Sequence, residues 1–109
     1  MVAVSRTIPA TTTDRLLAFP LDVTDRAAVH AALDRAVAHF GRLDVVVNNA
    51  GYLAMGMVEE FTEAQARAQL ETNFFGPLWV TQAALPHLRR RGADTWCGSR
   101  ASARSAAFR

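Results

Sequence analysis

The sequence predicts an α/β protein whose parallel strands alternate with helices, and three observations support this fold class. Residues 45–47 are a run of three consecutive valines, and they lead directly into a polar loop at residues 48–51. Such a run is typical of a strand covered on both faces, as in a parallel sheet packed between helices. An apolar run at residues 16–21 and a helical pattern at residues 24–40 precede it. This order predicts a right-handed crossover that joins the two strands as parallel neighbours in one sheet.

Two strands are expected before the first helix. Residues 1–5 are a short apolar run, and Arg6 lies just beyond its carboxyl end. Residues 7–14 contain three successive threonines and predict a loop. Residues 16–21 predict the second strand, and Pro20 indicates an edge strand because proline has no backbone N–H for the ladder.

The first helix has a signal at each end. Thr24 is the expected N-cap, and Asp25 lies in the first turn, where the helix dipole favours a carboxylate. Gly41 is expected to end the helix. The residues expected on its buried face are Val29, Leu33, Ala36, Val37 and Phe40.

Two further helices are expected after the central strand. Thr62 and Gln65 form a capping box at the start of the first. The second covers residues 77–91 and should bend at Pro86, which removes one backbone donor. The residues expected to face inward are Ala66, Leu70 and Phe74 in the first helix and Leu78, Thr81, Ala84, Leu85 and Leu88 in the second.

Positive charge is concentrated at the C-terminal end of the chain. The net charge is +2, yet residues 1–88 hold nine carboxylates and six arginines, whereas residues 89–109 hold six arginines and one aspartate. Residues 92–109 are rich in alanine, serine and arginine, and they cannot bury enough apolar area to offset chain entropy. We therefore expect a folded part at residues 1–91 and a disordered tail at residues 92–109. Such a tail is more often solvated than bound to nucleic acid, so no nucleic-acid partner is expected.

Cysteine content and hydropathy exclude several other classes. Cys97 is the only cysteine, which excludes an intrachain disulfide and a cysteine-built zinc site, and no metal site is expected. No apolar run approaches the roughly 18 residues that a membrane span needs, and the N-terminus lacks the layout of a signal peptide. We therefore expect a soluble cytoplasmic protein with no membrane partner.

Four motifs occur in order along the chain. They are Val2-Ala3-Val4-Ser5-Arg6, Leu21-Asp22-Val23-Thr24-Asp25, Asn48-Asn49-Ala50-Gly51 and Thr72-Asn73-Phe74-Phe75-Gly76. As an ordered set they resemble the short-chain dehydrogenase/reductase family, whose members are Rossmann-fold, NAD(P)-dependent oxidoreductases. The resemblance covers residues 1–91 and implies a partial Rossmann fold, with a three-layer α/β/α arrangement and parallel strands. It also implies hydride transfer between a small-molecule alcohol and a carbonyl.

The resemblance implies a cofactor contact for several of these residues. Asp22 matches the aspartate that hydrogen-bonds the adenine, and Val23 would pack on the ring. Asn48, Ala50 and Gly51 match the loop along the adenine-ribose side, where small residues let the cofactor approach the backbone. The alternatives are a helix-leading Asx turn for Asp22 and an ordinary turn after an apolar strand for the loop.

The end of the first strand indicates which cofactor is preferred. A free ribose 2′-hydroxyl usually meets a carboxylate here, whereas a 2′-phosphate calls for a guanidinium. The chain offers Ser5 and Arg6 and no acid at this place. The cofactor is therefore expected to be NADP, with NAD as the alternative, unless Arg6 is simply solvated.

Most of the family's catalytic residues have no match in this chain. These enzymes use a serine, a tyrosine and a lysine, but the chain has no lysine, and Tyr52, its only tyrosine, matches no catalytic position. Asn73 is the one catalytic match: it corresponds to the helix-interrupting asparagine whose main chain holds a water in the proton relay. Its alternative is an ordinary polar helix residue. We expect the chain to be catalytically incomplete.

The strand and glycine-rich turn that cradle the pyrophosphate would precede Met1. In the family's sheet that strand lies between the strands at Val2 and Val47. These two strands would then face a gap, at a cost of roughly 1–3 kcal/mol for each buried backbone group left unpaired, or would pair with each other.

The C-terminal segment suggests a reading-frame shift near Gly92. With GC-rich codons assumed, another frame through residues 93–102 resembles the family's next strand and its catalytic serine. The alternatives to an enzyme are a non-catalytic remnant that forms a homo-oligomer through residues 77–91 and an interaction module with a basic tail.

Overall fold

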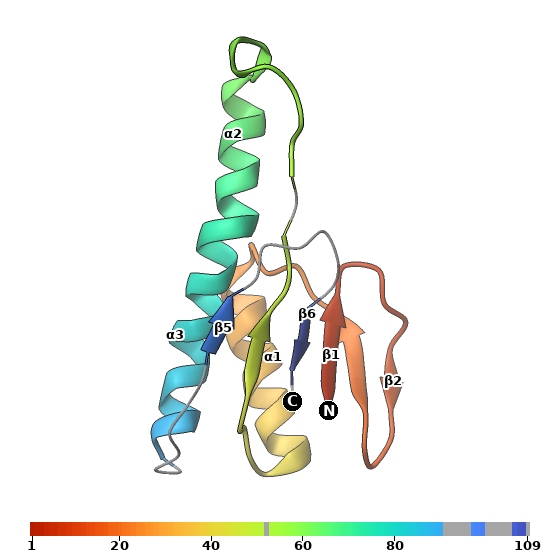
Figure 1. Ribbon diagram of the computed structural model, residues 1–109. Helices are drawn as coiled ribbons and strands as arrows, with labels where there is room; N and C mark the ends of the chain where they lie inside the picture. Colours follow the sequence, from red (N-terminus) through yellow and green to blue (C-terminus); the bar gives the residue numbers. More distant parts are fainter. Residues whose placement is uncertain (52, 91–96, 100–105, 109) are drawn as a thin grey trace.

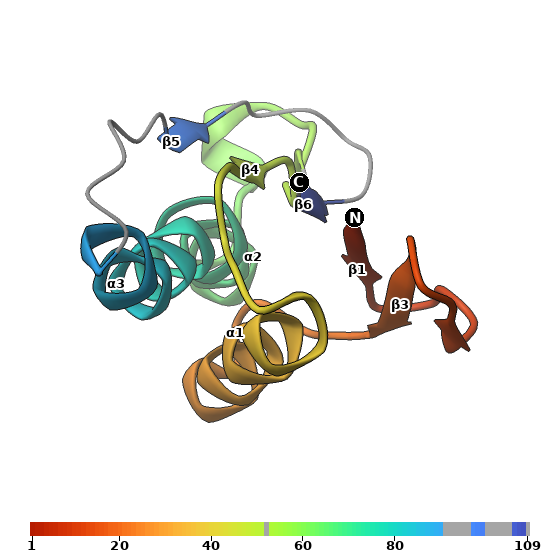
Figure 2. The same ribbon diagram turned by 90° about the horizontal axis from the view of Figure 1, so that it is seen from below.

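The fold is a mixed sheet with helices on one face (Figures 1 and 2). The computed structural model describes residues 1–51, 53–90, 97–99 and 106–108. Six strands form the sheet in the order β2-β3-β1-β6-β4-β5. They are β1 (Val2–Ser5), β2 (Thr11–Thr12), β3 (Leu17–Pro20), β4 (Val46–Asn48), β5 (Cys97–Ser99) and β6 (Ala106–Phe108).

Four of the six strands run in the same direction. β1 is parallel to β3, and β4 is parallel to β5. β6 is antiparallel to both β1 and β4, so β1 and β4 are parallel to each other. β2 is antiparallel to β3. The predicted partial α/β fold with parallel strands is confirmed.

The order of the strands differs from the prediction in two ways. β3 and β4 are not neighbours, because β1 and β6 lie between them. β3 is also not an edge strand, because β2 forms within the segment predicted as a loop. Pro20 is tolerated there because β2 pairs only with Leu17 and Ala18, so no strand lies against Pro20 on that side.

The expected gap between β1 and β4 is occupied by β6. This strand pairs with Val2, Ala3 and Val4 on one side and with Val46 and Val47 on the other. The physical reason is that two strand edges present backbone donors and acceptors that almost any extended segment can pair with, whatever its side chains. Of the predicted disordered tail, β5 and β6 are therefore strands, while residues 92–96, 100–105 and 109 lie outside the described residues.

The helical elements are α1 (Arg26–Phe40), η1 (Val58–Glu60), α2 (Glu63–Leu70), η2 (Glu71–Phe75) and α3 (Gly76–Arg89). Figure 2 shows α1 and α3 side by side on one face of the sheet, so the structure describes two of the three expected layers. The core between them includes Val4, Leu17, Val29, Val46 and Val80, each almost fully buried. Val45, which directly precedes β4, is 36% exposed.

The first helix is capped by a different residue than expected. The Asp25 side chain accepts a hydrogen bond from the Ala28 N–H at 3.0 Å and is the N-cap, whereas Thr24 bonds back to Asp22. A carboxylate one residue nearer the helix reaches the free N–H groups more directly. Gly41 ends the helix as predicted, with a φ of 74°.

The elements α2, η2 and α3 form one continuous rod (Figure 1). The capping box of Thr62 and Gln65 is confirmed. The inward orientation expected for Ala66, Leu70 and Phe74 is wrong, since Ala66 is exposed and the other two side chains are 56% and 58% exposed. The reason is that α2 extends beyond the end of the sheet, where there is no core to face. Further along, α3 buries Val80, Ala83, Ala84 and Leu88 against the sheet and α1.

Candidate functional site

The predicted site residues gather at one edge of the sheet. Because β1, β3 and β4 are parallel, their carboxyl ends lie at the same edge (Figure 1). Ser5 is level with Pro20 in the register of β1 and β3, which brings Arg6 and Asp22 close together just beyond these strands. Asn48 is the last residue of β4. The carboxyl edge of parallel strands is where open α/β sheets hold ligands.

Asp22 is fixed by a turn that leads into α1. Its Oδ1 accepts the Thr24 N–H at 3.0 Å and the Thr24 hydroxyl at 2.8 Å. These two hydrogen bonds lower the pKa of the Asp22 carboxyl, partial burial opposes them, and the charge of Arg6 adds to the lowering. Asp22 is thus an exposed anion, and among the described residues its Oδ2 accepts no hydrogen bond. The turn itself is the Asx-turn alternative considered above.

Val23 lies against the start of α3. It is 8% exposed, and a Cβ placed on Gly76 would lie 2.7 Å from its Cγ2. Glycine at this position therefore allows the rod to approach the loop after β3. Most of the Val23 side chain is already covered by protein, so a flat ligand could contact only its remaining edge.

The loop after β4 begins in the core and becomes more exposed. Asn48 is 5% exposed and is the one buried polar side chain among the described residues. Ala50 is partly buried and packs against the core. Asn49 and Gly51 are also partly exposed. A buried amide at a strand end is expected to be held by hydrogen bonds, which fixes the start of the loop.

Asn73 lies in a π-helical turn between α2 and α3. The Gly76 N–H donates to the Glu71 carbonyl five residues earlier. The cause is visible in the sequence: Pro77 has no N–H to donate to the Asn73 carbonyl four residues earlier, which disturbs the α-helical ladder. Single π turns inside helices are frequent at functional sites. The predicted helix interruption at Asn73 is thus present, and Pro77 is the sequence signal for it.

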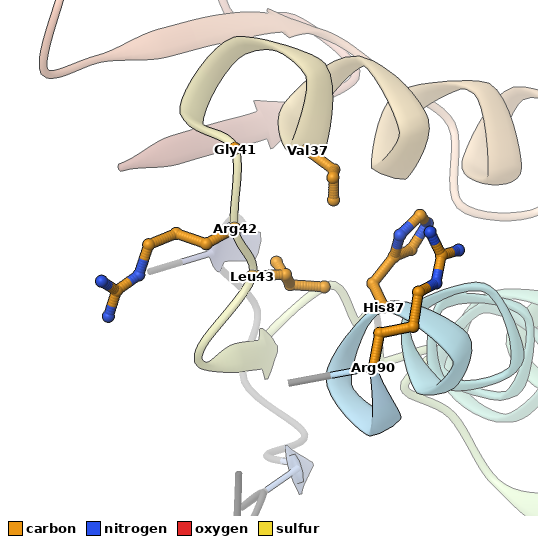
Figure 3. A pocket seen from close by; sticks show the side chains of 6 residues that line it. All are labelled: Val37, Gly41, Arg42, Leu43, His87 and Arg90. Atoms are coloured by element: carbon orange, nitrogen blue, oxygen red, sulfur yellow. The ribbon is translucent and has the colours of Figure 1, made fainter. Parts of the chain in front are cut away.

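A hollow of about 280 Å³ lies at the opposite end of the sheet (Figure 3). Figure 3 shows that His87 of α3 and Arg90, the residue that follows α3, face Val37 of α1 across it, while the Arg42 side chain points away. Arg42 bonds to Asp44 at 2.8 Å, and His87 lies 3.2 Å from Asp34. Arginine side chains are favoured near helix C-termini, which is where Arg42 and Arg90 lie. The hollow is separate from the residues at the carboxyl edge and belongs to a different end of the fold.

In the part of the chain that the structure describes, no three histidine, cysteine, aspartate or glutamate side chains are arranged to hold a metal ion. No helix within the described ranges is long and apolar enough to cross a membrane.

Comparison with known proteins gives consistent matches. The family described as short chain dehydrogenase matches residues 1–95. An uncharacterized oxidoreductase of Schizosaccharomyces pombe is 38% identical over 76 residues, which is 70% of this chain and 32% of that protein. A short-chain dehydrogenase from Streptomyces avermitilis is 41% identical with a TM-score of 0.70, over 77% of this chain and 31% of that chain. The structure of ElxO with NADP bound has a TM-score of 0.73 and 31% identity, over 79% and 35% of the two chains.

These matches cover most of this chain but a minor part of each relative. The chain spans about a third of the length of the curated S. pombe protein and of the two solved structures. The match of residues 1–95 includes the carboxyl edge described above and the whole rod from α2 to α3.

Proposed function

Because the chain belongs to the short chain dehydrogenase family, we propose that it forms the adenine side of the cofactor site of an NAD(P)-dependent oxidoreductase. The proposed reaction is hydride transfer between an alcohol and a carbonyl, in which the bound nicotinamide gives or takes the hydride. The observation that carries the proposal is the convergence of Arg6, Asp22 and Asn48 at one edge of parallel strands. The cytoplasm is the proposed compartment, since a chain with one cysteine needs no oxidising environment.

Each residue has a proposed task that its surroundings support. The Oδ2 atom of Asp22 accepts a hydrogen bond from the exocyclic amine of adenine, while the Thr24 bonds hold the carboxylate in place and ionised. Val23 contributes its exposed edge to the ring. Ala50 and Gly51 line the adenine ribose, which their small size allows to come close to the backbone. The buried Asn48 holds this loop against the core.

NADP is the proposed cofactor because of the charge beyond β1. Arg6 is exposed and forms no ion pair within 4 Å among the described residues, so its guanidinium is available to a 2′-phosphate. Ser5 is partly exposed, and among the described residues its Oγ accepts only the Thr7 N–H, at 3.3 Å. The hydroxyl hydrogen of Ser5 remains available to a phosphate oxygen. The ElxO relative supports this proposal because it binds NADP.

We propose that this chain binds cofactor without turning over substrate. None of its 109 residues is lysine, and its one tyrosine, Tyr52, lies outside the described residues. Asn73 is the one residue of the proposed proton relay, in which the main chain at the π turn holds a water. The reading-frame hypothesis concerns residues 93–102, of which most lie outside the described residues, and gene sequencing remains its test.

Titration of the chain with NADPH and NADH tests the cofactor proposal. Arg6→Ala should weaken NADPH binding by about 10-fold to 150-fold, because one charge-assisted contact of roughly 1.5–3 kcal/mol is lost, and should leave NADH unchanged. Arg15→Ala is the matched control, since Arg15 is also exposed but lies at the opposite end of β3. Asp22→Asn should weaken both cofactors. Equal binding of NADPH by the parent chain and Arg6→Ala would contradict the NADP proposal, and turnover of a carbonyl would contradict catalytic incompleteness.

A second candidate function is association of two copies of the chain. The proposed contact consists of residues 77–91 and the part of the rod that precedes them. Positions 71, 75, 78, 82, 85 and 89 of the rod follow the alternating four-and-three spacing of a helix-pairing seam. Of these residues, Phe75, Leu78 and Leu85 are apolar and only partly buried. Glu71 lies at one end of this line and Arg89 at the other, and no acidic residue occurs between them. An antiparallel pair of rods would therefore place Glu71 of each copy against Arg89 of the other, which is the self-complementary contact of a two-fold dimer.

A charge exchange tests this association by analytical sedimentation at several concentrations. Glu71→Arg and Arg89→Glu should each shift the parent dimer toward monomer, and the double variant should restore it. Arg90→Glu is the control because Arg90 lies next to the seam and not on it. A parent chain that stays monomeric at all concentrations, or a double variant that fails to recover, would exclude the seam.

A further inference from the structure

Arg6 and Asp22 place opposite charges near each other at the carboxyl edge of the sheet. The Leu21 N–H donates to the Ser5 carbonyl at 3.0 Å, which fixes the chain after β3 beside the end of β1. Arg6 directly follows Ser5, and Asp22 directly follows Leu21. The charge of Arg6 lowers the pKa of the Asp22 carboxyl, yet the two groups form no ion pair within 4 Å among the described residues. Each charge therefore acts on the other through space and not by contact.

The Asp22 carboxylate is held in place by Thr24. Its Oδ1 accepts both the Thr24 N–H at 3.0 Å and the Thr24 hydroxyl at 2.8 Å. These hydrogen bonds favour the ionised carboxylate and fix it in the turn before α1. A ligand group that binds to Arg6 therefore meets a fixed negative charge close by.

This negative charge affects the two cofactors differently. A phosphate monoester such as the ribose 2′-phosphate carries a charge of about −1.5 to −2 at neutral pH. The ionised Asp22 repels this group, although the same carboxylate is proposed to accept a hydrogen bond from the adenine of the same nucleotide. The ribose 2′-hydroxyl of NAD is uncharged and does not meet this repulsion. Asp22 should therefore favour adenine and oppose the 2′-phosphate.

We propose that Asp22 is a specificity-determining residue that selects against the 2′-phosphate, so that the balance between Arg6 and Asp22 sets the preference between NADP and NAD. The inference rests on the proposed cofactor site and gives a second role to the residue assigned to adenine. Both residues are exposed, so water and salt screen their charges. Removal of the Asp22 charge should therefore shift the preference toward the 2′-phosphate by about twofold to fivefold.

The experiment is calorimetric titration of the full chain with adenosine 2′,5′-bisphosphate and with adenosine 5′-monophosphate, which differ only in the 2′-phosphate. The measured quantity is the dissociation constant of the monophosphate divided by that of the bisphosphate. Asp22→Asn should weaken both probes through the adenine contact and raise this ratio by about twofold to fivefold at low salt. The increase should disappear near 1 M salt, where the Debye length is about 3 Å. Asp14→Asn is the matched control, since Asp14 is an exposed carboxylate at the opposite end of β3 and should leave the ratio unchanged.

A second background tests the sign of the effect. In Arg6→Ala the attraction is lost and the repulsion remains, so the bisphosphate should bind more weakly than the monophosphate. Asp22→Asn in this background should remove that difference. An Asp22→Asn ratio equal to that of the parent chain at low salt, or one raised equally at every salt concentration, would overturn the inference and leave the cofactor site standing. Binding of neither probe at millimolar concentration would overturn the proposed site and the inference with it.

Discussion

Replacement of Gly76 by alanine should destabilise the chain when residue 23 is valine and stabilise it when residue 23 is alanine. A Cβ on Gly76 would lie 2.7 Å from Cγ2 of Val23 and 3.3 Å from its Cβ. Val23 is 8% exposed and β-branched, so it has little freedom to move aside. Overpacking of this kind costs typically about 1–3 kcal/mol. Alanine in a helix is favoured over glycine by about 1 kcal/mol. The net effect of Gly76→Ala is therefore destabilisation by about 0–2 kcal/mol.

In a Val23→Ala background the 2.7 Å clash disappears, and only the milder 3.3 Å contact with the Cβ of residue 23 opposes the helix preference. Gly76→Ala should then stabilise the chain by up to about 1 kcal/mol, so the two substitutions should show a coupling of about 1–3 kcal/mol. Urea denaturation followed by circular dichroism measures all four corners of this cycle. Gly56→Ala is the control, because the nearest atom to its added Cβ is 3.8 Å away. The same effect of Gly76→Ala in both backgrounds would refute the close approach of the rod to the loop after β3.

Two further predictions concern the turn and cap before α1. The pKa of Asp22 is lowered by the two Thr24 hydrogen bonds and by Arg6, against a smaller effect of burial. A carboxyl whose folded pKa lies below its unfolded value of about 3.9 stabilises the fold above that pH and loses its contribution as pH falls through the folded value. Urea denaturation at a series of pH values should therefore show the advantage of the parent chain over Asp22→Asn shrinking below about pH 4, and a constant difference down to about pH 2 would contradict it. Asp25→Ala should cost about 1 kcal/mol by freeing the Ala28 N–H, whereas Asp25→Asn should cost less, as urea denaturation at neutral pH would show.

The elements that sequence analysis located correctly are those specified by local chemistry. The capping box of Thr62 and Gln65 and the left-handed Gly41 depend only on residues within one or two turns, and both are present. The strands β1, β3 and β4 follow from apolar runs that any packed sheet would bury. The convergence of Arg6 and Asp22 then follows from parallel strands alone. These parts needed no knowledge of long-range partners.

The elements that it missed depend on partners that a sequence pattern does not specify. The inward face assigned to Leu70 and Phe74 assumed that a core lies beside every amphipathic helix, but α2 projects beyond the sheet. The strand β6 forms in a segment of alanine and phenylalanine without a strand pattern, because β1 and β4 supply the pairing edges. Helical spacing and strand alternation report which side of an element is apolar, not what lies opposite.

Some groups of the proposed site at the carboxyl edge are oriented by neighbouring residues of this chain, whereas dinucleotide binding also depends on other groups. Asp22 is oriented by Thr24, two residues away, and Arg6 follows a strand whose register with β3 is fixed by four residue pairs. These contacts hold the proposed adenine-side groups in place within the described chain. A dinucleotide, however, gains much of its affinity from a phosphate cradle of backbone N–H groups at a helix N-terminus. Binding through the adenine side alone should therefore depend strongly on Asp22 and Arg6, which makes substitutions at these two residues the most sensitive test of the proposed site.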